Sequence, residues 1–281
     1  MAGLDLYRPE TNSDMLFDPI DLDMLIQKPI KDHRGNPIEP LTNRRIVSLV
    51  PSLTELLFDL GLGANVEGRT KFCIHPADQV QTAKRVGGTK KFQIEQILAL
   101  SPDLIVCNKE ENYQDGVELL SEHHSVLVTE IYTLEDALRV NAELGYLTRT
   151  EDRAKAINQE IFIGFSQIPV RPEKQKVAYV IWDDPLMVVG KHTFIDDMIK
   201  AAGFLNAFDN LERYPIITHQ NLAEAAPDRI FLSSEPFPFR DKHVKQFATL
   251  LPSAQIELVD GELFSWYGSR LTKSAAYFAT L

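Results

Sequence analysis

Aromatic and basic side chains recur in short polar segments of this sequence, each placed just after an apolar, β-branched run. These segments carry Pro51, Ser52, Lys71, Phe72, His75, Thr89, Lys90, Asn108, Lys109 and Glu110 in the first half, and Trp182, Asp183, Lys191, His192, Glu235, Phe237, Trp266, Tyr267 and Arg270 in the second. Aromatic rings suit flat, partly apolar faces of a ligand, and Lys and Arg favour an anionic rim. A solvated loop is the alternative for each residue taken alone, so the predicted binding site rests on the whole set.

The histidines offer a second kind of chemistry, the binding of a metal ion. His75, His192, His219 and His243 show no close spacing such as His-x-x-x-His, so metal ligands would have to come together from both halves of the chain. Direct metal-ion binding is therefore an alternative function, and we assign no metal ligand.

Nucleophilic catalysis has little support in the sequence. Cys73 and His75 are close neighbours, but there is no Gly-x-Ser-x-Gly elbow, and residues 87–91 lack the spacing of a phosphate-binding loop. A buried, apolar role suits Cys73 better. We assign no catalytic residue and no cofactor, and keep an enzyme acting on an anionic small molecule as a second alternative.

The overall charge argues against one class of partner. The 281 residues carry a formal net charge of −11, whereas a nucleic-acid-binding surface needs a basic face. The two cysteines are too few for the disulfide framework of a small secreted domain.

There is no apolar run of about 18 residues and no signal-peptide pattern near the start. We therefore expect a cytoplasmic protein if Met1 is native, and a periplasmic or membrane-anchored one if a signal segment was removed.

The polar segments end the strands of an alternating β/α pattern. Residues 45–50, 102–107, 176–182 and 227–232 form apolar runs of the kind that is buried in parallel sheets. Helical patterns with Ser or Thr before them and Gly after them lie between several of these runs. This alternation predicts an α/β protein with mainly parallel sheets, in which ligands bind beyond the carboxyl ends of the strands.

A repeated pattern divides the chain into two lobes. Residues 95–108 read EQILALSPDLIVCN and residues 220–233 read QNLAEAAPDRIFLS, each a helix, then Pro-Asp, then an apolar strand. We predict an N-terminal arm with a short hairpin at residues 1–43, a first lobe at 44–150, a connecting helix at 151–167 and a second lobe at 168–281.

The connecting helix is predicted from its apolar spacing. Ala154, Ile157, Ile161 and Phe165 recur at helical intervals, and Thr150 is placed to cap the first turn. A helix of this length spans roughly 25 Å, about the height of a small domain. An ordinary crossover helix within one α/β domain is the alternative.

Three motifs of the first half resemble a known family. They are RIVSLVPSLTE at residues 45–55, VGGT at 86–89 and ILALSPDLI at 97–105. These motifs are similar to those of the helical-backbone, class III substrate-binding proteins of ABC importers, with the cobalamin-binding members nearest and the siderophore binders next. The resemblance covers residues 44–281. It implies two Rossmann-like lobes joined by one rigid helix, with a ligand held between them and no catalysis.

The resemblance also assigns roles to residues. Positions that match ligand-facing residues of the family are Phe72, His75, Gly88, Thr89, Asn108, Tyr214, Trp266 and Tyr267. Thr89 stands where the cobalamin binder has a tryptophan, and Asn108 replaces an aromatic residue. The family docks its importer through one acidic residue on each lobe. Glu95 matches the first, whereas the second position is Gln220, so a permease partner is left open.

Together, these observations predict a monomeric binding protein that is not an enzyme. Its ligand is a bulky anionic or metal-chelate compound, a corrinoid before a ferric siderophore or haem. The predicted ligand-binding residues are Ser52, Lys71, Phe72, His75, Gly88, Thr89, Asn108, Lys109, Trp182, Lys191, Tyr214, Glu235, Trp266, Tyr267 and Arg270.

Overall fold

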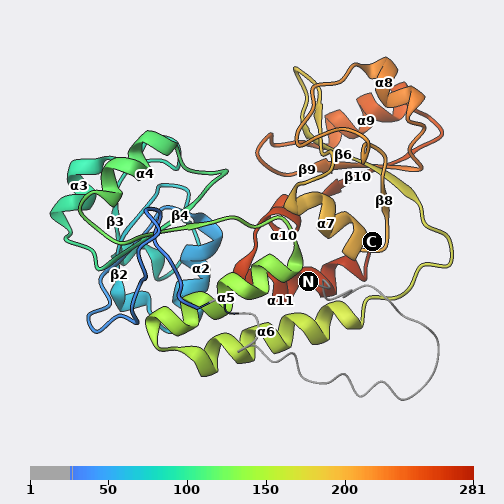
Figure 1. Ribbon diagram of the computed structural model, residues 1–281. Coiled ribbons are helices and arrows are strands. Elements are labelled where there is room, and N and C mark those ends of the chain that lie inside the picture. Colours follow the sequence, from blue (N-terminus) through green and yellow to red (C-terminus); the bar gives the residue numbers. More distant parts are fainter. Residues whose placement is uncertain (1–25, 27) are drawn as a thin grey trace, which may run out of the picture.

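Two α/β lobes stand side by side above a long helix, α6 (Glu151–Ser166), in the computed structural model of the protein (Figure 1). The structure describes residue 26 and residues 28–281. Each lobe has its own sheet, and the two sheets share no strand. This arrangement confirms the predicted fold class of two mainly parallel lobes joined by a backbone helix.

The first lobe is built on five parallel strands in the order β3-β2-β1-β4-β5. The order reverses between β1 and β4, so the loops that follow these two strands open onto the same crevice. Both strands are buried along their whole length, as parallel strands covered on both faces are. The elements are β1 (Ile46–Ser48), α2 (Pro51–Asp59), η1 (Gly63–Asn65), β2 (Val66–Arg69), η2 (Val80–Thr82), β3 (Lys84–Arg85), α3 (Ile94–Ala99), β4 (Leu104–Asn108), α4 (Gln114–Ser121), β5 (Val126–Thr129) and α5 (Leu134–Thr148).

The second lobe has a smaller parallel core with an antiparallel edge. Its sheet runs β10-β9-β6-β7, with β8 also pairing with β6, and only the pair of β6 and β7 is antiparallel. The elements are β6 (Lys176–Trp182), β7 (Met187–Val188), α7 (Phe194–Ala201), β8 (Leu205–Asn206), α8 (His219–Glu224), β9 (Arg229–Ser233), α9 (Asp241–Leu250), β10 (Gln255–Val259), α10 (Gly261–Ser265), η3 (Gly268–Arg270) and α11 (Leu271–Phe278). Within the described residues, each helix is too short or too polar to span a bilayer.

Helix α6 buries the face that its spacing predicts. Ala154, Ile157 and Ile161 are buried, and the Phe165 ring meets Phe278 of α11 edge-on, with ring centroids 6.0 Å apart. The predicted cap is wrong, because the Thr150 side chain makes no cap hydrogen bond and its hydroxyl pairs instead with that of Thr148, 2.9 Å away. The helix therefore owes its place to packing rather than to a side-chain cap.

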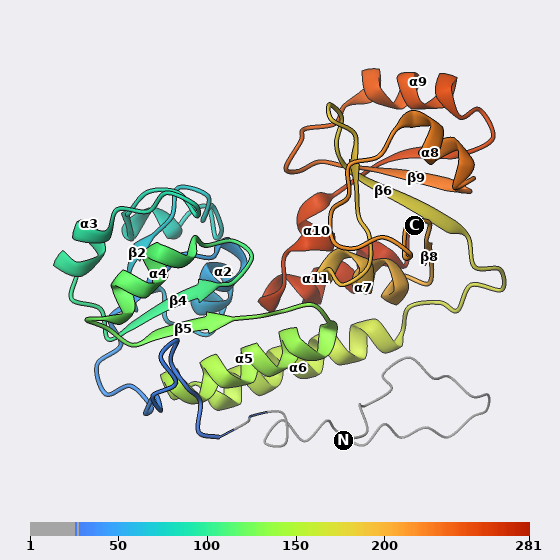
Figure 2. The same cartoon turned by 45° about the horizontal axis from the view of Figure 1, so that its top comes forward.

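Helix α5 lies against α6 along its length (Figure 2). The Asn141 amide donates to the Asn158 side-chain oxygen over 2.8 Å, and the Asn158 amide donates to the Leu138 carbonyl over 2.7 Å. Gly145 lets the helices approach, since a Cβ there would stand 2.5 Å from the Cβ of Ala154. The connector is thus a packed pair of helices.

One apolar cluster passes through both lobes. It contains Val106 of the first sheet, Ile157 of α6, Tyr179 of the second sheet and Phe264 of α10. Because close-packed interiors resist deformation, this shared core opposes hinge bending between the lobes.

The C-terminal segment crosses from the second lobe to the first. Gly268 lies against α2 with φ +84°, and a Cβ there would stand 3.3 Å from the Ser52 carbonyl oxygen. Since this segment belongs to both lobes, the domain limits at residues 44, 151 and 168 stay a prediction.

Most of the predicted N-terminal arm lies outside the described residues. Its hairpin does not, and Lys31 and Pro37 form an antiparallel bridge there around Gly35.

Candidate functional site

A cavity of about 430 Å³ opens between the lobes, within the range of roughly 300–1,000 Å³ that small-molecule sites occupy. Both lobes contribute walls, and apolar surface predominates. The lining residues are Pro51, Ser52, Phe72, Ile74, Thr89, Asn108, Glu110, Glu111, Ile131, Phe194, Ile195, Tyr214, Glu235, Pro236, Ser265, Trp266 and Tyr267.

Asn108 shapes the first-lobe wall at the carboxyl end of β4. Its side-chain oxygen accepts from the backbone N–H of Glu110 over 2.8 Å, and the Asn112 side-chain oxygen accepts from the backbone N–H of Asn108 over 2.8 Å. The Asn112 amide also donates to the Thr89 carbonyl over 3.1 Å. These bonds join two loops and present Glu110 and Glu111 to the cavity.

Glu111 is held by a hydrogen bond from the opposite wall. The Tyr267 hydroxyl donates to its Oε1 over 2.9 Å. Burial raises the pKa of Glu111 to about 7, although the Tyr267 hydrogen bond and the charge of Lys90 act in the opposite direction. This carboxyl group therefore titrates near neutral pH.

Glu235 orients the aromatic wall of the second lobe. Its Oε1 accepts from the Ser265 hydroxyl over 2.7 Å and from the Trp266 indole N–H over 3.0 Å. Burial raises the pKa of Glu235, against the effect of these two donors. Trp266 thus presents its ring to the cavity in one fixed orientation.

Beside Trp266 lies a cluster that we call the rear network, made of the buried Glu55 and Arg270 and the partly buried His75 and Glu262. Arg270 donates to both oxygens of Glu55 over 2.7 and 2.9 Å, and its Nη1 lies 2.7 Å from Glu262. The Arg270 guanidinium lies 4.8 Å from the Trp266 ring centroid, and the His75 ring packs edge-on against the same indole. The His75 Nε2 is 3.1 Å from Glu262. The rear network therefore positions Trp266 and joins the lobes.

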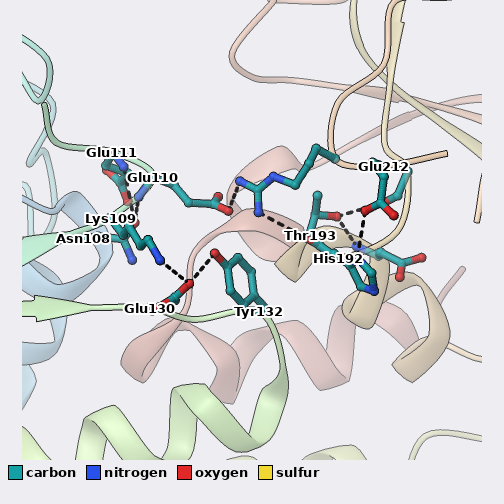
Figure 3. A network of polar contacts seen from close by, with 12 residues as sticks. Asn108, Lys109, Glu110, Glu111, Glu130, Tyr132, His192, Thr193 and Glu212 are labelled. Carbon is teal, nitrogen blue, oxygen red and sulfur yellow. Dashed lines mark hydrogen bonds and ion pairs between the residues drawn. The ribbon is translucent and has the colours of Figure 1, made fainter. Parts of the chain in front are cut away.

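A second cluster, the mouth network, joins the lobes at a more exposed place. It consists of Lys109, Glu110, Glu130, His192, Glu212 and Arg213. Figure 3 shows Lys109 and Tyr132 directed at Glu130, and His192 directed at Glu212. Arg213 forms an ion pair with Glu110 of the first lobe and donates to the His192 carbonyl over 3.1 Å. Within the mouth network, the ion pair of Arg213 with Glu110 is the contact that joins the second lobe to the first.

The structure brings about half of the predicted ligand-binding residues together. Those that line the cavity are Ser52, Phe72, Thr89, Asn108, Tyr214, Glu235, Trp266 and Tyr267, and those outside the lining are Lys71, His75, Gly88, Lys109, Trp182, Lys191 and Arg270. Except for Gly88, which was selected through the family resemblance, the second set was selected by position at strand ends, which brings residues near a site without fixing where their side chains point.

Each residue outside the lining has another role. Lys109 pairs with Glu130, Lys191 pairs with Glu212, and His75 and Arg270 belong to the rear network. Lys71 lies over the Phe72 ring, 4.8 Å from its centroid, and Gly88 lies beside the same ring. Trp182 donates its indole N–H to the Asp184 carbonyl over 2.9 Å and packs on Phe237. Lys109, Lys191 and Arg270 are therefore paired with the protein's own carboxylates, whereas Lys71 stays beside a ring that lines the cavity.

Sequence reasoning assigned no role to several lining residues. They are Ile74, Glu111, Ile131, Phe194, Ile195 and Pro236. Phe194 and Ile195 begin α7, directly after the segment that carries Lys191 and His192, and that adjacency is the signal that could have found them. Glu111 follows three predicted strand-end residues, but its hydrogen bond comes from Tyr267, far away in the sequence.

The cysteines and histidines show no arrangement for catalysis or metal binding within the described residues. No group of three or more His, Cys, Asp or Glu side chains there could hold a metal ion. Cys73 is buried, its Sγ accepts from the Thr54 hydroxyl over 3.1 Å, and burial raises its pKa, so the reactive thiolate is disfavoured.

The two predicted docking positions occupy equivalent helices of the two lobes. Glu95 is exposed in the first turn of α3, the helix before β4. Gln220 is exposed in the first turn of α8, the helix before β9, and donates to Glu224 over 2.8 Å.

Comparisons with known proteins agree with this geometry. Residues 46–250 match the family model described as periplasmic binding protein. A vitamin B12-binding protein of Pectobacterium atrosepticum is 23% identical over 83% of this chain and 86% of its own. An ABC transporter substrate-binding lipoprotein of Bacillus subtilis, YvrC, is 25% identical over 66% of this chain and 62% of its own.

Solved structures show the same fold. The periplasmic heme-binding protein HutB of Vibrio cholerae superposes with a TM-score of 0.74 at 19% identity, covering 85% of this chain and 98% of its own. The vitamin B12-binding protein BtuF of Vibrio cholerae superposes with a TM-score of 0.69 at 18% identity, covering 84% of this chain and 95% of its own. The resemblance to the binding proteins of ABC importers is thereby confirmed.

The expected cytoplasmic location is wrong. The matched family is one of periplasmic binding proteins, and one relative is a lipoprotein. The expectation rested on the pattern of the first residues, which is the part of a chain that export machinery reads.

Proposed function

Because the chain belongs to the periplasmic binding protein family, we propose that it is a substrate-binding protein that holds a bulky metal chelate, a corrinoid before haem or a ferric siderophore. Proteins of this family are non-catalytic components of transport, which confirms that the chain is not an enzyme. One observation carries the ligand proposal: a cavity between the lobes is walled by aromatic rings from both of them.

The mode of binding follows from the walls. Phe72 of the first lobe and Trp266 of the second supply apolar faces for a large flat ring. Ser52, Asn108 and Tyr267 supply polar groups at the cavity surface. The shared core and the rear network hold the lobes at a nearly constant separation. A ligand of matching thickness is bound with little loss of conformational freedom in the protein.

The two tryptophans provide a matched test. Trp266 lines the cavity, whereas Trp182 packs on Phe237 outside it. Cobalamin is titrated into the wild type and into Trp266→Ala and Trp182→Ala, with binding followed by absorbance and calorimetry. We expect binding at tens of micromolar or tighter, at least tenfold weaker in Trp266→Ala and within twofold of wild type in Trp182→Ala. No binding by the wild type would refute the corrinoid assignment.

The chain as a monomer is proposed to deliver its ligand to an ABC permease. Glu95 supplies the acidic contact of the first lobe, and its exposure leaves it available to a partner. Glu95→Ala in a transport assay with the cognate permease should reduce uptake while leaving ligand affinity unchanged. Unchanged uptake would remove Glu95 from the interface.

A further inference from the structure

The cavity is acidic as well as aromatic. Its lining contains three carboxyl groups, those of Glu110, Glu111 and Glu235, and among the described residues it contains no Lys, Arg or His. Glu110 and Glu111 belong to the first lobe, where Glu110 pairs with Arg213 and Glu111 with Tyr267. Glu235 belongs to the second lobe and pairs with Ser265. A ligand in this cavity therefore meets carboxyl groups from both lobes.

The three carboxyl groups are not equally neutralised. Glu110 has the ion pair with Arg213. Glu111 accepts a hydrogen bond from a phenol, and Glu235 accepts from a hydroxyl and an indole, all of them neutral donors. Both carboxyl groups use Oε1 for these bonds, and in the described part of the chain no hydrogen bond is made to either Oε2. A carboxylate has about four acceptor positions, so both groups keep acceptor capacity for a ligand.

Ser52 adds another unsatisfied polar group. Its side chain is 3% exposed and lines the cavity. Its hydroxyl lies near that of Tyr267 but forms no hydrogen bond of ordinary geometry with the described residues. Since buried polar groups are normally paired, a ligand that reaches Ser52 gains a contact that the protein alone does not make.

Three of the nearby basic side chains, Arg213, Arg270 and Lys191, are engaged by the protein's own carboxylates, whereas Lys90 donates to the Glu110 backbone carbonyl and Lys71 lies over the Phe72 ring. Arg270 is bound by Glu55 and Glu262, and Lys191 by Glu212. Arg270 is 7% exposed and lies beside the Trp266 ring, so it has no direct path to a ligand in the cavity. A ligand carboxylate would enter beside Glu111 and Glu235, where like charges in a partly buried site repel strongly.

We propose that this cavity selects a ligand whose edge carries hydrogen-bond donors or positive charge, and rejects one whose edge carries carboxylates. The inference rests on the proposed function and narrows its ligand class. A corrin ring edged with amides and holding a cationic metal fits Glu111 and Glu235, whereas haem, with two carboxylates, does not. Glu111 and Glu235 are specificity-determining residues in this assignment.

Two corrins that differ chiefly in the charge of the edge test the inference. Cobinamide carries amides around the ring, and cobyrinic acid carries carboxylates at the same places. Both are titrated in their dicyano forms at pH 7.5 into the full chain. We expect cobinamide to bind at least tenfold more tightly. Equal or tighter binding of cobyrinic acid overturns the inference and leaves the proposed function standing.

Variants assign the preference to the two carboxyl groups. The double variant Glu111→Gln with Glu235→Gln keeps both hydrogen-bond acceptors and removes both charges. It should bring the two corrins within about threefold of each other, chiefly by tighter binding of cobyrinic acid. Glu122→Gln, an exposed change at the end of α4, should leave the tenfold preference intact. An unchanged preference in the double variant overturns the assignment.

Failure of the proposed function gives a different pattern. If neither corrin binds, the corrinoid assignment is wrong, and haem is compared with its diamide, in which both carboxylates are amides. At least tenfold tighter binding of the diamide supports the inference. Tighter binding of haem, or no binding of either compound, overturns it.

Discussion

The rear network and the mouth network both join the lobes through arginine and glutamate, yet they differ in burial. In the rear network, the side chains of Arg270 and Glu55 are 8% and 7% exposed. In the mouth network, those of Arg213 and Glu110 are 40% and 25% exposed. Removing one partner of a buried ion pair leaves an uncompensated charge, whereas a solvated pair contributes little. We infer that the rear network fixes the lobes and that the mouth network can open for a ligand.

The largest expected effect is on the rear network. Arg270→Ala leaves the buried carboxylate of Glu55 without its two-pronged partner, so the free energy of unfolding should fall by about 3–5 kcal/mol. Urea unfolding measures the change. Arg270→Lys keeps the charge but loses the two-pronged contact with Glu55, and it should fall between wild type and Arg270→Ala. A loss below about 1 kcal/mol in Arg270→Ala would show that the burial of this pair does not matter.

Glu111, which follows Glu110 of the mouth network in the chain, gives the next largest effect. Its folded-state pKa of about 7 lies above the ordinary value of 4.5, so between these values the folded chain holds a proton that the unfolded chain releases. The free energy of unfolding contributed by this group therefore falls as pH rises, by about 1–3 kcal/mol in total, and the loss is complete above the folded-state pKa.

Glu111→Gln should remove this pH dependence. The test is the difference in unfolding free energy between wild type and variant from pH 5 to pH 8, which cancels the titration of other groups. We expect the wild type to lose stability relative to the variant as pH rises. A constant difference across this range would contradict a raised pKa for Glu111.

A smaller effect is expected at the mouth network. Arg213→Ala removes the ion pair with Glu110, which is partly solvated, so stability should change by less than about 1 kcal/mol. The same change should raise the ligand dissociation rate several-fold, because it removes an ion pair between the lobes at Glu110, which lines the cavity. Stopped-flow displacement measures this rate. A stability loss as large as that of Arg270→Ala would erase the distinction between the networks.

The smallest effect is expected for Lys109→Ala. Lys109 pairs with Glu130 within the first lobe, and their side chains are 62% and 46% exposed. Stability and dissociation rate should both stay within experimental error, since solvated pairs contribute about 0–1 kcal/mol. Lys109→Ala is thus the control for Arg213→Ala, with the same number of charges removed and no contact between lobes lost.

Much of the fold followed from local pattern. The apolar runs, the helix at residues 151–167 and the repeated Pro-Asp strands correspond to β1, β4, β6, β9 and α6, because burial on both faces leaves a continuous apolar run. The helix α10 was not predicted, since its short sequence has no repeating apolar face. The Thr150 cap was also wrong, because local sequence does not show that Thr148 competes for its hydroxyl.

The features of the site also divide into those that local sequence predicts and those that it does not. The sequence by itself determined that Phe72, Trp266 and Tyr267 lie near one crevice, because the strand-end rule acts on every parallel sheet. The family resemblance added Tyr214. Only the tertiary structure decided the charge of that crevice. Arg270 and Glu55 are 215 positions apart, and Tyr267 and Glu111 are 156 apart. Whether a cation faces a ligand or one of the protein's own carboxylates depends on such distant pairs, and no local pattern of residues encodes them.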